Sequence, residues 1–378
     1  MRIVAAALLA LLLPLLVLAQ EAPAPEMPVA EKPVAEKPVA EKPAESPKFS
    51  TVEVCIPRIT GMTKEQPKKF DIAGSLRLPA GEKPAAGWPA VLFVSGSGSQ
   101  TRQGIQGKLD IGTTQLLDAV AEGGFAVLAV DDRGVGQTPM GEEGKDPKTI
   151  GYLDLVGDAK ACLAWLQAHE AVNRGKVFVI GHSEGGLTAP ILAADDETVA
   201  GIVCMGAMGR NLYDVTLDQV EAAMKGQPAE QREGNLKAQR EFMTAVKEGR
   251  DPDWNVVGAE AAPVLKAQWK QSIEPIKAWW HDHFNLDVPA IHARVKCPVF
   301  VAQGAADFQT SAERDARQIV KDVLTGPCTD VRLKIYADLD HLFKPCGGRA
   351  SDIKMYFEKR DVDAAFKADV VSWLVQHR

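Results

Sequence analysis

This sequence has fewer basic residues than acidic ones. Its 378 residues include 43 lysines and arginines against 50 aspartates and glutamates, which gives a formal net charge of −7. A mild acidic excess provides neither the basic surface that nucleic-acid binding requires nor a polybasic segment for an anionic membrane. We therefore expect no nucleic-acid partner.

Cysteine is also scarce, with six residues in the whole chain. Six cysteines in a protein of this length do not make a disulfide scaffold, although some of them can pair in an exported protein. Cys328 and Cys346 bracket an expected strand and its following loop, and they form the pair that we consider first. Cys162 and Cys204 fall in apolar helix and strand patterns, which favour buried free thiols.

Long apolar runs are confined to the N-terminus. Arg2 precedes an apolar stretch at 3–18 that Pro14 interrupts, and Val17-Leu18-Ala19 offers small residues for cleavage before Gln20. This pattern is typical of a secretory signal peptide at 1–19, because the stretch is a little short for a membrane span. We expect a periplasmic or secreted protein with no stable membrane span after cleavage, and a retained anchor is the alternative.

Large apolar side chains are missing from residues 20–48. Val-Ala-Glu-Lys-Pro occurs there three times in succession, at 29–33, 34–38 and 39–43. A proline in every repeat blocks helix and sheet, so this segment is expected to be an extended linker. The remaining residues, 49–378, are then the folded domain.

This domain contains an alternation of strand and helix patterns. Two strands at 51–56 and 70–78 form an expected hairpin, and mostly continuous apolar runs predict strands at 90–94, 125–130, 177–180, 201–205, 298–303 and 331–336. Helical patterns lie between them at 113–121, 152–168, 187–194 and 313–324, with a last one at 362–376. The pattern predicts an α/β fold with a mostly parallel sheet flanked by helices. Residues 207–292 carry no strand signal and predict a helical cap.

The segment Gly181-His182-Ser183-Glu184-Gly185 organises the interpretation of the chain. A Gly-x-Ser-x-Gly motif between a buried strand and a helix indicates a nucleophile elbow, in which a strained turn exposes the serine at the end of the sheet. Outside that setting the same pattern is an ordinary glycine-rich turn.

A serine nucleophile requires a base and an acid that orients the base. His341 alone among the seven histidines follows the last expected strand, at the edge of the sheet where the serine lies. Asp307 follows the preceding strand, whereas its rivals Asp338 and Asp340 share the loop of the histidine. The order Ser183, Asp307, His341 is the order expected in an α/β-hydrolase.

The oxyanion hole needs two backbone N–H groups. Glu184 supplies one because it directly follows the nucleophile, and the loop after the strand at 90–94 supplies the other, with Ser97 as our candidate. This loop has no Gly-x-Gly-x-x-Gly spacing, since position 101 is threonine, and no Lys-Ser/Thr of a P-loop. We expect no nucleotide and no other cofactor.

Two further clusters carry polar side chains but predict no chemistry. Asp131-Asp132-Arg133-Gly134 lies where a loop turns sharply, and a structural role is favoured there. His281-Asp282-His283 offers two histidines without a third ligand nearby, so we expect no metal site.

On these residues the chain resembles the α/β-hydrolase superfamily. The matching segments are 181–185, the Asp-Arg-Gly-x-Gly turn at 132–136, Gly304-Ala305-Ala306-Asp307, and Asp340-His341-Leu342-Phe343. Val-Ser-Gly-Ser-Gly at 94–98, together with Gly-Ser-Leu-Arg-Leu-Pro at 74–79, resembles a group of bacterial carboxylesterases. The resemblance covers residues 50–378, with the cap matched least. It implies Ser183 as nucleophile, His341 as base and Asp307 as its partner. Such carboxylesterases usually carry proline and then an acidic or polar residue where this chain has Ser99-Gln100, which leaves the second oxyanion donor open.

The sequence therefore predicts a serine hydrolase that cleaves short-chain carboxylic esters through an acyl-enzyme. Residues 207–292 offer little apolar surface for a long lipid chain, and this favours a small ester as substrate. A peptidase or a thioester hydrolase on the same triad, and a non-catalytic binding protein on a hydrolase scaffold, are the alternatives. The sequence does not indicate the oligomeric state.

Overall fold

The computed structural model of the protein describes residues 48–62, 67–143, 145–224, 228–257 and 262–378. The expected signal peptide lies outside these residues, as does the linker except for Lys48. No helix in this part of the chain is long and apolar enough to cross a membrane.

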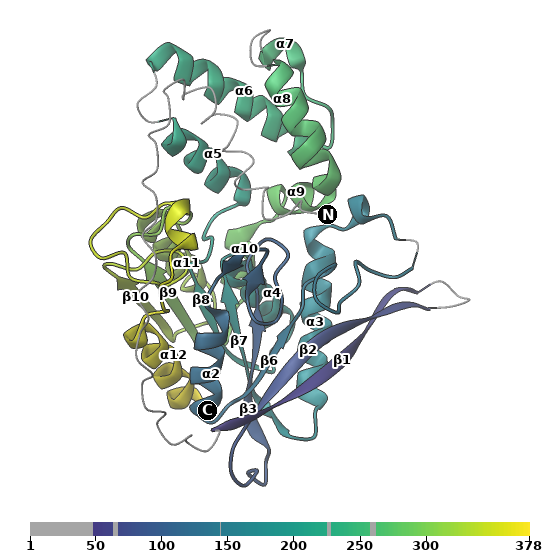
Figure 1. Ribbon diagram of the computed structural model, residues 1–378, viewed down its shortest axis with the longest axis vertical. Coiled ribbons are helices and arrows are strands. Elements are labelled where there is room, and N and C mark those ends of the chain that lie inside the picture. Colours follow the sequence, from purple (N-terminus) through teal and green to yellow (C-terminus); the bar gives the residue numbers. More distant parts are fainter. Residues whose placement is uncertain (1–47, 63–66, 144, 225–227, 258–261) are drawn as a thin grey trace, which may run out of the picture.

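An eight-stranded sheet forms the centre of the molecule (Figure 1). Its spatial order is β1-β2-β6-β3-β7-β8-β9-β10. These strands span Phe49–Met62, Pro67–Pro79, Ala126–Val130, Trp88–Val94, Val172–His182, Val199–Met205, Val299–Gly304 and Val331–Tyr336. The six strands from β6 to β10 pair in parallel, and the central residues of all of them except the edge strand β10 are buried apolar side chains. A parallel sheet of this kind is buried on both faces, as the continuous apolar runs predicted.

The two N-terminal strands form the expected hairpin and are longer than predicted. β1 pairs antiparallel with β2 over the register Phe49↔Pro79 to Met62↔Pro67, and β2 pairs antiparallel with β6. A separate short ribbon is formed by β4 (Ile105–Gln106) and β5 (Leu109–Asp110).

Helices cover both faces of the sheet. α2 (Thr113–Glu122) and α12 (Ala364–His377) pack on one face, where Phe125, Phe178 and Trp373 are fully buried. α3 (Tyr152–Ala168), α4 (Glu184–Asp195) and α11 (Arg317–Val323) pack on the other. The helix expected at 313–324 is divided, because a π turn, η4 (Ala312–Ala316), precedes α11.

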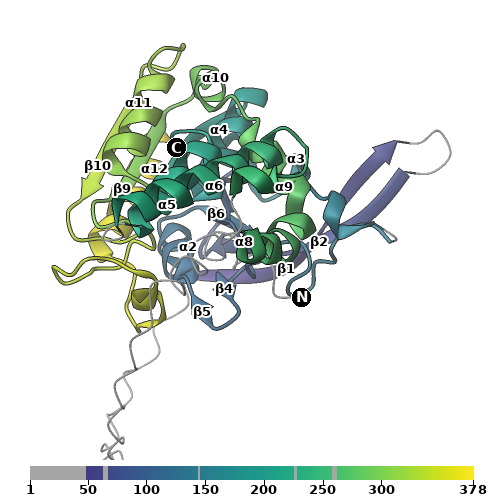
Figure 2. The same ribbon diagram turned by 90° about the horizontal axis from the view of Figure 1, so that it is seen from above.

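Residues between β8 and β9 form a layer of helices above the carboxyl ends of the parallel strands (Figures 1 and 2). They comprise α5 (Leu212–Ala223), α6 (Ala229–Lys247), α7 (Trp254–Val257), α8 (Ala262–Gln268), α9 (Lys277–Phe284) and α10 (Val288–Ala293). Short turns are η1 (Pro147–Thr149), η2 (Trp269–Ile273), η3 (Glu274–Ile276) and η5 (Ile353–Phe357). Trp269, Trp279 and Trp280 are buried in the core that joins these helices to α3 and α4. The tryptophans therefore serve mainly to pack this helical layer onto the sheet domain.

All six cysteines are free thiols, so the predicted Cys328–Cys346 disulfide is wrong. Cys328 lies before β10 and donates a hydrogen bond to the carbonyl oxygen of Cys297 at 3.1 Å. Cys346 lies beyond the other end of β10, and its N–H donates to the carbonyl of Asp338. A strand of this length spans roughly 20 Å, which separates the two thiols.

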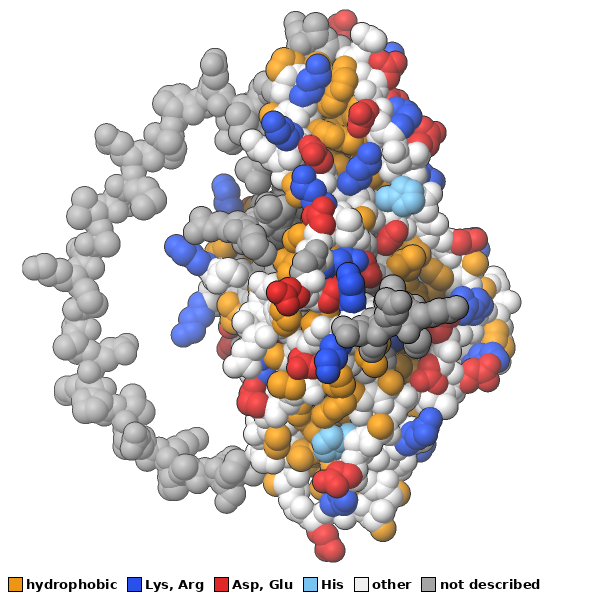
Figure 3. Space-filling model, turned by 90° about the vertical axis from the view of Figure 1, so that its right-hand side faces the viewer, with side chains coloured by type: hydrophobic (Ala, Val, Ile, Leu, Met, Phe, Trp, Pro, Cys, Tyr) orange, Lys and Arg blue, Asp and Glu red, His pale blue; other side chains and the backbone are white. Residues whose placement is uncertain are grey.

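Acidic and basic side chains are interspersed on the face shown in Figure 3. No large area of this face carries a single sign of charge.

Candidate active site

Ser183 lies in the turn between β7 and α4, as the motif predicted. Its backbone has φ 54° and ψ −115°, a strained conformation for a residue with a side chain. The Ser183 N–H donates to the carbonyl of Met205, and the Ser183 carbonyl accepts from the N–H of Gly186. These bonds hold the strained turn, which lies at the carboxyl end of the sheet.

The glycines on either side of Ser183 permit this turn because there is no room for a side chain at either position. A Cβ on Gly181 would lie 2.0 Å from the carbonyl oxygen of Gly185. A Cβ on Gly185 would lie 2.2 Å from the carbonyl oxygen of Val94. The motif thus sets how closely β7, α4 and the end of β3 approach each other.

The structure brings Asp307 and His341 together. Asp307 follows β9 and His341 follows β10, and His341 Nδ1 lies 2.7 Å from Asp307 Oδ2. Both side chains are buried. Burial raises the pKa of the Asp307 carboxyl, but the adjacent imidazole and the hydrogen bonds from Thr310 outweigh burial, and the pKa lies below its usual value. Asp307 is therefore an ionised acceptor that fixes the tautomer with a proton on Nδ1.

The rival carboxylates are engaged elsewhere. Asp340 pairs with Arg360 at 2.7 Å and accepts hydrogen bonds from the N–H groups of Leu342 and Lys344. Asp338 accepts from the N–H groups of Gly347 and Gly348. Both residues shape the loop of the histidine and neither contacts the imidazole.

Residues next to Ser183 and Met205 in the sequence contact His341. The ring of His182 lies 4.9 Å from the ring of His341, and His182 Nε2 donates to the carbonyl of His341 at 2.9 Å. A Cβ on Gly206, which follows Met205, would lie 3.2 Å from His341 Nδ1. Burial and the neighbouring His341 together lower the pKa of His182 to about 3, so His182 is a neutral support for the loop.

The loop after β3 lies directly over the elbow. A Cβ on Gly96 would lie 3.0 Å from the Cβ of Ser183, and Ser97 lines the pocket of Ser183. Gln100 is buried, and its side-chain amide donates to the carbonyl of Gly96 at 3.1 Å. Gln100, the second residue at which the chain departs from the carboxylesterase pattern, thus braces the loop from within.

Asp132 is a residue of this site whose role the sequence did not reveal. Its carboxylate accepts from Ser95 Oγ at 2.7 Å and from the N–H of Gln100 at 2.8 Å. The adjacent residues belong to separate networks, because Asp131 pairs with Arg102 and Arg133 pairs with Asp158. A signal was present in the sequence: β6 and β3 both end in polar loops, and neighbouring parallel strands bring such loops together.

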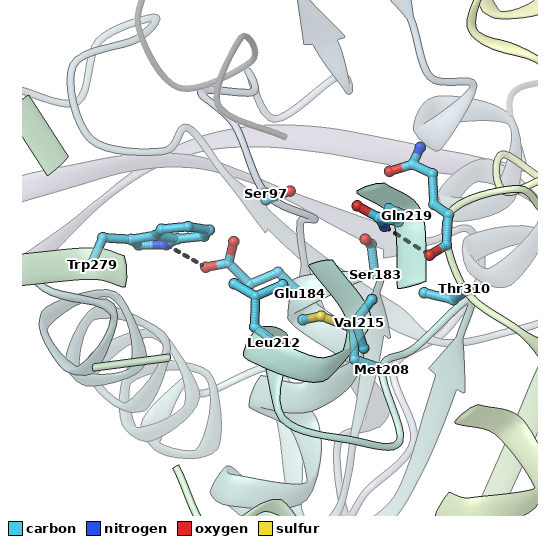
Figure 4. A pocket seen from close by; sticks show the side chains of 10 residues that line it. Ser97, Ser183, Glu184, Met208, Leu212, Val215, Gln219, Trp279 and Thr310 are labelled. Atoms are coloured by element: carbon cyan, nitrogen blue, oxygen red, sulfur yellow. Dashed lines mark hydrogen bonds between the residues drawn. The ribbon is translucent and has the colours of Figure 1, made fainter. Parts of the chain in front are cut away.

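Glu184 begins α4, so its N–H has no intrahelical acceptor and is available to a ligand. Its carboxylate accepts from Trp279 Nε1 at 3.2 Å and lies 3.5 Å from Nε2 of the buried His283. Figure 4 shows the Ser183 hydroxyl between Ser97 on one side and Thr310 on the other, with Met208, Leu212 and Val215 below it. Gln219 reaches this pocket from α5 and donates to the carbonyl of Gln309 at 2.8 Å.

Asp307 also accepts hydrogen bonds from two residues that the sequence did not point to. Gln303 Nε2 donates to Asp307 Oδ2 at 2.8 Å and Thr310 Oγ1 donates to the same oxygen at 2.7 Å. They precede and follow Asp307 by four and three residues, and no motif distinguishes them from ordinary loop residues.

Asp282 and His283 of the 281–283 cluster contact the start of α3. Asp282 accepts from the N–H of Leu153 at 3.1 Å, at the N-terminus of α3, and His283 stacks on Tyr152. Within the described residues, no group of three or more His, Cys, Asp or Glu side chains is arranged to hold a metal ion.

Comparisons with known proteins agree with this architecture. Residues 112–248, which include the elbow, match the model of a family described as serine aminopeptidase, S33. None of the curated proteins matches the sequence. A hypothetical protein of Pseudomonas aeruginosa has a similar structure, with a TM-score of 0.52 and 14% identity over 88% of this chain and 95% of its own. An esterase of Pyrococcus furiosus gives a TM-score of 0.50 and 16% identity, covering 87% of this chain and 91% of its own.

At such identities the solved structures establish the fold alone. The family model matches the segment that contains the elbow. The sheet, its flanking helices and these structural matches show that the chain has an α/β-hydrolase fold.

Proposed function

We propose that the protein is a serine hydrolase that cleaves carboxylic esters through an acyl-enzyme. The observation that carries this proposal is the Asp307–His341 hydrogen bond of 2.7 Å beside the strained Ser183. A buried carboxylate, an oriented imidazole and a serine at the same sheet edge are the parts that nucleophilic acyl transfer requires.

In the proposed reaction, Ser183 Oγ attacks the acyl carbonyl and its proton passes to His341 Nε2. Asp307 holds the Nδ1 proton and stabilises the imidazolium that forms. The N–H groups of Glu184 and Ser97 donate to the oxyanion. The alcohol leaves with the proton from His341. Water, activated by the same imidazole, then releases the acid and restores Ser183.

Labelling with a fluorophosphonate probe tests the proposal. The probe is expected to modify Ser183 in the folded protein, and peptide mapping by mass spectrometry locates the label. Ser99→Ala is the control, because Ser99 lies on the neighbouring loop and is not assigned a role. Absence of labelling in the folded wild-type protein would favour the non-catalytic alternative.

Asp132 offers a second test, because it accepts hydrogen bonds from Ser95 and Gln100. These residues belong to the loop after β3 that carries the proposed donor Ser97, which we call the oxyanion loop. Asp132→Ala is expected to lower kcat for p-nitrophenyl acetate roughly tenfold or more, since one misplaced oxyanion donor costs at least this much. Asp132→Asn can accept from Gln100 and donate to Ser95, so it should retain most of the activity. Equal losses in the two variants would contradict the proposed role of the loop.

The same residue predicts a dependence of stability on pH. Burial raises the pKa of Asp132 to about 7, although hydrogen bonds from Ser95 and Gln100 oppose the shift. The folded state then holds the carboxyl proton of Asp132 more tightly than the unfolded state does. The contribution of this proton to the free energy of unfolding is therefore lost as the pH rises from about 4 to about 7. Between pH 5 and pH 8, the free energy of unfolding of the wild-type protein should therefore fall by about 2 kcal/mol relative to that of Asp132→Asn, as measured by urea unfolding. A constant difference between the two proteins would contradict the prediction.

The family description makes an aminopeptidase the second candidate. An aminopeptidase must bind the α-ammonium group of its substrate, and Glu184 is the carboxylate that borders the pocket. Its Oε1 is already engaged with Trp279 and lies near His283, which disfavours that role. Aminoacyl p-nitroanilides and thioesters assayed beside p-nitrophenyl esters distinguish these activities.

A further inference from the structure

A second cavity of about 450 Å³ adjoins the small pocket at Ser183. The two share Ser97, Glu184 and Trp279 as common walls. The pocket at Ser183 itself encloses only about 10 Å³. Any group larger than a few atoms that is attached to the reacting carbonyl must therefore extend out of the small pocket, and the cavity is the adjoining space.

The walls of the cavity are mostly apolar, and they belong to the sheet and α3. They include Ile72, Leu92, Val130, Leu155, Ala159 and Cys162. The charged residues that also line it already have partners. Arg133 Nη2 donates to Asp158 at 2.7 Å, and the Asp132 carboxylate accepts from Ser95 and Gln100. Lys148 pairs with Glu274 at 3.7 Å. Such walls favour an occupant without charge.

The geometry of proton transfer decides which half of an ester enters the cavity. The leaving oxygen receives its proton from His341 and must face that residue. Thr310, which hydrogen-bonds to Asp307, lines the pocket on this side. Ser97 and Glu184 lie on the other side, where the cavity begins (Figure 4). The leaving group is thus directed toward Thr310 and the acyl group toward the cavity.

We infer that this cavity binds the acyl group of the substrate, and that the acyl group is uncharged and of medium chain length or aromatic. The inference rests on the proposed esterase function and extends the short-chain expectation. The volume is about three times the roughly 150 Å³ of an apolar cavity that holds a benzene ring. A hexanoyl, octanoyl or benzoyl group fits such a space.

Filling the cavity tests the inference. Ala159→Phe places a ring in the cavity wall, and Ala164→Phe is the matched control because Ala164 is exposed on the same helix. Ala159→Phe is expected to lower kcat/KM for p-nitrophenyl octanoate roughly tenfold or more and to change that for p-nitrophenyl acetate less than twofold. The control should leave the ratio of the two esters unchanged. Equal losses on both esters, or no loss on the octanoate, would overturn the inference.

A cavity-enlarging variant provides an independent measurement if Ala159→Phe does not fold. Leu155→Ala should shift the preference of the enzyme toward acyl chains longer than octanoate. With octyl acetate the long chain is on the alcohol side, so Ala159→Phe should leave its hydrolysis unaffected, and a selective loss there would overturn the assignment to the acyl group. If wild-type protein hydrolyses no ester at all, the proposed function itself fails.

Discussion

Ser183→Ala is expected to lower kcat for p-nitrophenyl acetate roughly 10⁴-fold to 10⁶-fold, the range found when a triad nucleophile is removed. The loss is large because the proposed reaction can no longer pass through an acyl-enzyme. Alanine keeps the Cβ and therefore the same strain at φ 54°. The melting temperature should stay close to that of the wild type, so the assay measures chemistry rather than folding.

Active-site titration sharpens this test. Wild-type protein should release a burst of p-nitrophenol equal to the enzyme concentration if deacylation is the slower step, and Ser183→Ala should release none. The Ser99→Ala variant controls for loss of any hydroxyl near the oxyanion loop and is expected to keep near-wild-type rates. Substantial ester hydrolysis by Ser183→Ala would refute the assignment of the nucleophile.

Asp307→Asn has the second largest expected effect, a loss of roughly 10²-fold to 10⁴-fold in kcat. Asp307 Oδ1 accepts from the N–H groups of Gln309 at 2.7 Å and Thr310 at 3.0 Å. These backbone donors require the amide oxygen of asparagine at the Oδ1 position. The NH₂ group then takes the place of Oδ2, faces His341 Nδ1 as a donor, and selects the tautomer that cannot accept the proton of Ser183.

The pH dependence of this variant separates a positioning role from a general structural one. The wild-type carboxylate has a lowered pKa, so its stabilising effect is present above the pKa of the unfolded state and is lost as the pH falls through the folded value. Asp307→Asn should remove that acid-dependent component of the unfolding free energy. Asp338→Asn is the matched control, because its carboxylate accepts from the loop N–H groups of Gly347 and Gly348. Activity that survives Asp307→Asn but falls in Asp338→Asn would reverse the assignment of the acid.

Local sequence patterns predicted most of the fold. Buried parallel strands have continuous apolar sequences and α3 has helical spacing, so their positions agree with the structure to within a few residues, apart from the longer start of β7. The divided helix at 312–323 was not predicted, because nothing in the local pattern distinguishes a π turn from an α-helical one. The Cys328–Cys346 pair was predicted wrongly because closeness in sequence was taken for closeness in space across a strand.

The candidate site was predictable to the extent that topology determines it. Parallel strands have their carboxyl ends at one edge, so residues that follow β7, β9 and β10 must meet there, and Asp307 and His341 do. Gln303, Thr310 and Asp132 were missed, because their roles depend on side-chain directions in loops. The same applies to Gln100, whose buried amide braces the loop at Gly96.

By itself, the sequence determined the fold class, the elbow at Ser183 and the order of the three candidate catalytic residues, because these depend on local periodicity, on glycines at tight turns and on strand order. Only the tertiary structure decided what surrounds that serine. The cavity beside it is lined by residues far apart in the chain, from Ile72 on β2 to Trp279 on α9. Its apolar surface comes mainly from the sheet and α3, whereas the sequence pointed to the cap as the part that selects the acyl group. A cavity is a gap left by packing between distant segments, and no local pattern records it.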